Sequence, residues 1–71
     1  MATWHARTAQ QMNDLVSAHG FSDAQINQLR VEAARWADVI GNERTKLFNV
    51  GNYQVRITAE NHEVTRVEIA A

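Results

Sequence analysis

The hydrophobic pattern of this 71-residue chain changes its period once, near residue 44. Before that point apolar residues recur every three or four positions, which is the spacing of an amphipathic helix. After it they alternate with polar residues, which is the spacing of a strand with one buried face. The change divides the chain into a helical half and a β half, and it therefore predicts an α+β fold.

Two helices are predicted in the first half, over residues 3–19 and 23–40. Gly20 between them suits the left-handed turn that ends many helices. Ser22 and Gln25 match a Ser-x-x-Gln capping box, in which each side chain bonds the backbone N–H of the other residue. The two helices are therefore expected to form a hairpin. Their predicted buried faces consist of Thr8, Met12, Leu15 and His19 in the first helix and Ile26, Leu29, Ala33, Trp36 and Ile40 in the second.

Three strands are predicted in the second half, over residues 44–50, 53–59 and 64–70. Gly51 and Asn52 fit the two-residue loop of a β-hairpin between the first two strands. The predicted architecture is a two-helix hairpin followed by a three-stranded antiparallel β-meander (ααβββ), with the long second helix packed on one sheet face. The helix-facing residues are expected to be Phe48, Val50, Tyr53, Val55, Ile57, Thr65, Val67 and Ile69.

The loop between the last two strands leaves two registers open. A loop of residues 60–62 sets Arg56 opposite Arg66, which are like charges. A loop of residues 61–63 sets Arg56 opposite Glu68. Opposite charges across a ladder stabilise it by a few tenths of a kcal/mol, and like charges destabilise it by about as much. The second register is therefore preferred.

The sheet face away from the helices is predicted to lie in solvent. Leu47 and Val64 fall on this face, where two apolar residues could anchor a partner. Arg56 is expected to pair across the ladder, which leaves Arg66, opposite Thr58, as the less engaged cation. The residues assigned to this outer face are Leu47, Asn49, Gln54, Arg56, Thr58, Val64, Arg66 and Glu68.

The size and composition of the chain indicate the need for a partner. A chain this short buries only about 60% of the surface that its unfolded form exposes. It has no cysteine, which excludes disulfides and thiolate metal sites. A net charge of −1 provides no field that would attract DNA or an anionic membrane. A homo-oligomer, or a complex with another protein, is therefore expected.

Neither an enzyme nor a cofactor or metal site is predicted. His5 and His19 are about 21 Å apart on a straight helix, too far to share a metal ion. His62 lies in a predicted turn, and the three glycines are isolated rather than gathered in a phosphate-binding loop. The chain also lacks an apolar run of membrane-spanning length and a signal-peptide pattern. We expect a soluble, cytoplasmic protein.

A nucleic-acid-binding regulator is the alternative function. The helices on either side of Gly20 have nearly the spacing of a helix-turn-helix. However, the start of the second helix carries Arg30 as its only cation, although phosphate contacts dominate affinity for nucleic acid. The outer sheet face, with Arg56 and Arg66, is predicted to lack an aromatic side chain on which bases could stack.

These observations favour a small non-enzymatic adaptor or inhibitor that binds another protein. Proteins of this size and composition are frequent in bacterial and phage genomes, and they act there on host complexes. The contact surfaces we predict are the outer sheet face, the free edge strand and one helix flank. Strand addition to a second copy is one use of a free edge. The predicted contact residues are Arg66, Arg56, Gln54, Leu47 and Val64 on the sheet and Arg30 and Arg35 on the helix.

Overall fold

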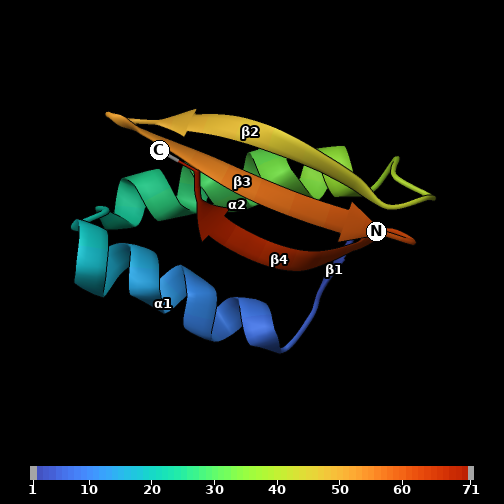
Figure 1. Ribbon diagram of the computed structural model, residues 1–71, viewed down its shortest axis with the longest axis horizontal. Helices are drawn as coiled ribbons and strands as arrows, with labels where there is room; N and C mark the ends of the chain where they lie inside the picture. Colours follow the sequence, from blue (N-terminus) through green and yellow to red (C-terminus); the bar gives the residue numbers. More distant parts are fainter. Residues whose placement is uncertain (1, 71) are drawn as a thin grey trace.

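The computed structural model describes residues 2–70, so the first and last residues of the predicted domain lie outside it. Within this range the chain forms two helices and a four-stranded mixed sheet, and the predicted α+β class is confirmed (Figure 1). In chain order the elements are β1 (Thr3–Trp4), α1 (Arg7–His19), α2 (Asp23–Ala37), β2 (Arg44–Val50), β3 (Tyr53–Glu60) and β4 (Glu63–Ile69).

The sheet has one strand more than the predicted meander. Its order is β1-β4-β3-β2, in which β2, β3 and β4 pair antiparallel and β1 pairs parallel with β4. Thr3 and Trp4 form β1, so the prediction of a helix from residue 3 is wrong. The helix begins at Arg7 instead, where the Thr8 hydroxyl donates to the His5 carbonyl at 2.6 Å. Trp4 is half-buried against the core, which explains why this segment lies along β4.

The connection between the helices follows the sequence prediction. Gly20 ends α1 in the left-handed conformation, with φ of +72°, and its N–H donates to the carbonyl of Val16. Ser22 and Gln25 form the complete capping box, with Gln25 N to Ser22 Oγ at 3.2 Å and Ser22 N to Gln25 Oε1 at 2.9 Å. Both helix ends are therefore stabilised by local interactions.

The end of α2 differs from the prediction. The helix stops at Ala37 rather than at Ile40. The N–H groups of Val39 and Ile40 donate to carbonyls three residues back, at Trp36 and Ala37, which is a tighter turn than an α-helix makes. Ile40 still packs against the core at the end of this turn.

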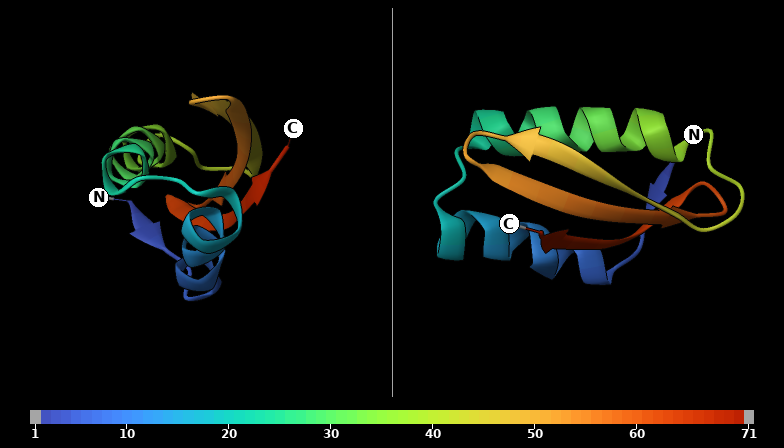
Figure 2. Two further views of the ribbon diagram at one scale, coloured as in Figure 1. Left: turned by 90° about the vertical axis from the view of Figure 1, so that its left-hand side faces the viewer. Right: turned by 45° about the horizontal axis from the view of Figure 1, so that its top comes forward.

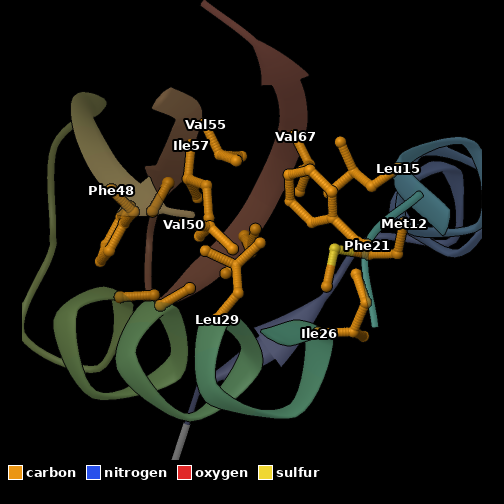
Figure 3. Close-up of a cluster of buried hydrophobic side chains, with 14 residues drawn as sticks. Met12, Leu15, Phe21, Ile26, Leu29, Phe48, Val50, Val55, Ile57 and Val67 are labelled. Carbon is orange, nitrogen blue, oxygen red and sulfur yellow. The ribbon is translucent and has the colours of Figure 1, made fainter. Parts of the chain in front are cut away.

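The two helices have different places on the sheet. Figures 1 and 2 show α2 across one sheet face and α1 alongside β4. Leu29 of α2 is fully buried where both helices and the strands meet (Figure 3). The opposite sheet face carries no helix (Figure 2). The core consists of Met12, Leu15, Phe21, Ile26, Leu29, Ala33, Ala37, Phe48, Val50, Val55, Ile57, Ala59, Val64 and Val67.

The hairpin of β2 and β3 has the predicted register. Val50 lies opposite Tyr53 and Phe48 opposite Val55, and the loop between the strands is the predicted pair of residues. Gly51 has φ of +58°, and a positive φ at the first loop residue is typical of a type II′ hairpin turn.

The hairpin of β3 and β4 has the preferred pairs but not the predicted loop. Arg56 lies opposite Glu68 and Thr58 opposite Arg66, as expected. However, the turn is two residues long, and Ala59 then pairs with Val64, so that Thr65 is an extra residue in β4. A β-bulge of this kind sets two residues of one strand against one residue of the other.

The bulge reverses two predicted orientations. Val64 is fully buried on the helix side, so its assignment to the outer face is wrong. Thr65 was expected to face the helices, but its hydroxyl donates to the Thr58 carbonyl and its side chain lines a hollow on the outer face. The cause is the turn, where Asn61 and His62 both have positive φ, the pattern of a type I′ turn.

Candidate functional site

A hollow of about 540 Å³ lies on the outer sheet face, on the side without helices. It forms because alternate residues of β3 and β4 point away from the core, and the bulge adds Thr65 to them. Three arginines and three glutamates line it, so opposite charges are present in equal number. Its lining residues are Arg7, Glu43, Thr45, Arg56, Thr58, Glu60, Thr65, Arg66 and Glu68.

Arg56 is already engaged within the hollow. Its Nη1 lies 3.4 Å from Glu68 Oε1, and the two side chains are 46% and 42% exposed. An ion pair this exposed contributes about 0–1 kcal/mol, because water screens both charges. The pair therefore orients Arg56 without contributing much to folding stability.

Arg66 is the less engaged guanidinium, as the charge pattern predicted. It is exposed, lies opposite Thr58, and has no ion pair or side-chain hydrogen bond with any residue from 2 to 70. The Thr58 hydroxyl lies 3.3 Å from the hydroxyl of Thr45, so the neighbouring polar group has a partner of its own. Arg66 thus presents its donors to the hollow and to solvent.

Arg7 brings a third guanidinium to the hollow from outside the sheet. Its Nε and its backbone N–H both donate to Nδ1 of His5, each at 3.1 Å. The sequence pattern does not indicate this role, because Arg7 falls within a predicted helix that has no defined position relative to the sheet. Only the pairing of Thr3 and Trp4 with β4 brings Arg7 to this face.

The other predicted contact residues do not gather at one place. Gln54 and Leu47 are exposed on the outer face but lie outside the hollow. Arg30 lines a smaller hollow of about 290 Å³ with Trp4 and residues of α1. Arg35 lines a third hollow between α2 and β2. Leu47 lines this third hollow as well, so one sheet contact and one helix contact share a surface, whereas Arg30 and the two arginines of β3 and β4 lie at other hollows.

The free edge of the sheet is β2, which ends the strand order. The Gln54 carbonyl accepts a hydrogen bond from Ala70 N at 2.8 Å, so Gln54 directs its backbone groups away from β2. Asn49, opposite Gln54, must therefore direct its own N–H and C=O outward. By the two-residue alternation of a strand, Leu47 and Thr45 do the same.

A hollow of about 600 Å³ lies beside this free edge, between α2 and β2. Lys46 points to the inner side of the sheet here, and its Nζ lies 5.3 Å from the centre of the Phe48 ring. Trp36 of α2 meets the same ring edge-on, with 5.9 Å between ring centres. Glu32 and Arg35 of α2 add two opposite charges to the lining of this hollow.

The histidines have separate structural contacts. His5 accepts hydrogen bonds from Arg7, His19 packs against Phe21 and Tyr53, and Nδ1 of His62 lies 2.9 Å from the Asp38 carbonyl. Within residues 2–70, no three His, Asp or Glu side chains are placed to hold a metal ion together.

Comparison with models of known protein families, with curated proteins and with solved structures found no match. In the part of the chain that the structure describes, neither helix has the length and apolar character needed to cross a membrane.

Proposed function

We propose that this protein is a non-catalytic module that binds another protein through its outer sheet face. The partner is a folded protein whose surface presents a carboxylate to Arg66. The single observation that carries this proposal is the exposed Arg66 in a hollow whose other central arginine, Arg56, already has an acidic partner. A guanidinium forms two parallel hydrogen bonds with a carboxylate, which makes such a contact specific in geometry as well as in charge.

The charge pattern of the hollow supports a protein partner. Arginines and glutamates interleave there, so a surface of one uniform charge meets repulsion as well as attraction. Complementary patterns of this kind steer association and exclude wrong partners more than they raise affinity. Leu47, 47% exposed in the neighbouring strand opposite Arg56, provides apolar area beside the charges. An adaptor or inhibitor that acts on a cytoplasmic host complex of a bacterium is the role we propose for such a surface.

The alternative remains a nucleic-acid-binding regulator, and three guanidinium groups at one hollow are the observation that favours it. Its affinity would fall steeply with salt, because phosphate contacts release counterions. Three carboxylates at the same hollow repel phosphates, and none of the lining residues is aromatic. We therefore place protein binding first.

The test is a charge reversal with a matched control. The chain would be used as bait in an extract of its native host, with the variants Arg66→Glu and Arg30→Glu beside the original sequence. Arg66 and Arg30 are both exposed arginines, but they lie on different surfaces. We expect a partner that the original chain and Arg30→Glu retain in constant stoichiometry and that Arg66→Glu loses.

A purified pair then gives the decisive measurement. Replacing the partner's contacting carboxylate by lysine should restore binding to Arg66→Glu while weakening binding to the original chain. If Arg66→Glu binds as tightly as the original and Arg30→Glu or Arg35→Glu does not, the helix flank is the contact surface and the proposal is wrong. Binding that is lost equally in all variants above moderate salt, with RNA or DNA recovered, supports the alternative.

A further inference from the structure

The two long edges of this sheet differ in how many of their backbone groups have hydrogen-bond partners. On the β4 side, Thr3 and Trp4 of β1 pair with the first residues of the strand. Further along β4, Gln11 accepts a hydrogen bond from the Val67 N–H. On the β2 side, seven residues of strand end the sheet with their outward backbone groups unpaired within the described chain. An open edge of this length is a template for another strand.

We propose that two copies of this chain join through β2, antiparallel, with Leu47 on the two-fold axis. The pairing uses β2, whose outward backbone groups have no partner among residues 2–70 of the same protomer. The outer edges of the joined sheet are then the two β4 sides, where β1 pairs with Glu63 and Val64, Gln11 accepts from the Val67 N–H, and α1 lies alongside. The assembly is therefore a closed, isologous dimer, because each protomer's β2 edge is used by the other and no β2 edge is left for a third copy.

The length of β2 selects this register. With Leu47 opposite the partner's Leu47, Arg44 lies opposite the partner's Val50, and every residue of the strand has a counterpart. Each alternative that keeps the outward groups paired shifts the strands by two residues. Such a shift leaves two residues at one end of each β2 strand without a counterpart in the partner's β2.

The charges of β2 select the same register. Centred on Leu47, it sets Lys46 opposite the partner's Phe48, and Lys46 already lies 5.3 Å from the ring of its own Phe48. An ammonium group is attracted to the face of an aromatic ring. The shift centred on Lys46 instead sets two ammonium groups opposite each other, which destabilises a ladder.

The same register covers an exposed apolar side chain. Leu47 is 47% exposed in the single chain, and on the axis it lies beside the partner's Leu47 on the outer face. Thr45 lies opposite the partner's Asn49, which is a neutral polar pair. On the inner side, the hollow of about 600 Å³ between α2 and β2 leaves room for the partner's side chains. The dimer would thus set two outer faces side by side.

The oligomeric state is the first measurement. Sedimentation velocity or light scattering at high micromolar concentration is expected to give twice the chain mass of 8.0 kDa. Leu47→Lys sets like charges on the axis while leaving the backbone ladder with β3 intact, so it is expected to give a folded monomer. A circular dichroism spectrum and a cooperative unfolding transition confirm that the variant is folded.

Single cysteines then read the register, because the chain has no cysteine of its own. Opposite residues in a hydrogen-bonded antiparallel pair have Cα atoms about 5.5 Å apart, within the roughly 4.4–6.8 Å that a disulfide spans. Leu47→Cys is therefore expected to form a disulfide dimer under mild oxidation. Thr45→Cys alone places its thiols about 13 Å apart, four residues along the strand, and is expected not to react.

The mixed experiment and the background control complete the test. Thr45→Cys and Asn49→Cys, mixed in equal amounts, are expected to form the heterodisulfide. Ser17→Cys, exposed on α1 away from β2, gives the rate of random collision. A monomer at all concentrations, together with Leu47→Cys oxidising no faster than Ser17→Cys, overturns the dimer.

A rapid disulfide at Thr45→Cys or Asn49→Cys alone overturns the proposed register. Leu47 contributes to both proposals, but Arg66 is outside the β2 pairing, so none of these results bears on Arg66. The bait experiment with Arg66→Glu can succeed with a monomer, and the dimer can form when that experiment fails.

Discussion

Gln11 of α1 and Val67 of β4 are joined by a hydrogen bond of 2.7 Å, from the Val67 N–H to Gln11 Oε1. β1 is only two residues long and does not extend as far as Val67. The side chain of Gln11 therefore accepts the hydrogen bond that a neighbouring strand would otherwise accept. Val67 is buried, and an unpaired N–H there would be costly. This contact makes α1 part of the sheet edge as well as part of the core.

Replacing Gln11 by Ala is expected to lower the free energy of unfolding by about 1–2 kcal/mol, because it leaves a buried donor unsatisfied. Gln10→Ala is the matched control, since Gln10 is exposed and bonds only to Asp14 within α1. Its effect is expected to stay within about 0.5 kcal/mol. Urea unfolding of the two variants gives both values.

Hydrogen exchange separates this contact from a general loss of stability. The Val67 amide is expected to exchange faster in Gln11→Ala than the global destabilisation accounts for. Amides in the hairpin of β2 and β3 provide the reference. Equal acceleration at all sites would show that Gln11 acts only through packing of α1.

Substitutions at Val64 and Leu47 test whether the bulge turns Val64 into the core. The sequence pattern predicts both residues on the outer face. Val64 is fully buried and Leu47 is 47% exposed. Val64→Ala is therefore expected to cost about 2 kcal/mol of stability. Leu47→Ala is expected to cost less than about 0.5 kcal/mol in the monomer. Similar small effects for both variants would contradict the register with Thr65 as the extra residue.

Most of the fold follows from local signals in the sequence. The alternation of β2 and β3 and the Gly51 loop give the hairpin register, and the capping box gives the start of α2. These features depend on residues that lie close together in the chain. They could therefore be predicted without knowing how the elements pack.

The features that were missed depend on distant contacts. Two residues carry no periodic pattern, so β1 is defined only by its pairing with a strand about sixty positions later. The turn at Asn61 and His62 has two non-glycine residues with positive φ, and their N–H groups donate to the carbonyls of Gly41 and Ile40. Those bonds to a remote loop fix a turn that pairing arguments alone did not predict.

The candidate site was likewise predictable only where it depends on pairing between neighbouring strands. The opposition of Arg56 and Glu68, and the freedom of Arg66, followed from charge pairing across the ladder. The presence of Arg7 did not, because it depends on the position of β1. Val64 was misplaced because one extra residue in a strand exchanges the two faces.

The capping box provides a prediction about α2. Ser22→Ala removes the acceptor for the Gln25 N–H and is expected to destabilise the protein by about 1 kcal/mol. Ser17→Ala, at an exposed position within α1, is the control and is expected to change stability by less than about 0.5 kcal/mol. Thermal unfolding followed by circular dichroism measures both. A stable Ser22→Gly variant beside a destabilised Ser22→Ala variant would point to the same cap, since Gly is tolerated there.

The ion pair on the outer face is expected to contribute little to stability. A double-mutant cycle with Arg56→Ala and Glu68→Ala should give a coupling energy below about 1 kcal/mol that decreases with salt. Arg66→Glu is expected to change stability by no more than about 0.5 kcal/mol. A coupling of several kcal/mol would mean that the pair is structural and that the hollow is part of the folded framework rather than a contact surface.

The closure of the β4 edge also determines the order in which the protein can assemble. Gln11 and Val67 are 56 positions apart, whereas the turns between β2, β3 and β4 are two residues long. Short hairpins close within microseconds, and contacts across a long loop come later because more chain entropy must be lost. The meander can therefore exist for a time with both edges bare. The rate at which α1 docks then sets how long the folding chain is exposed to aggregation.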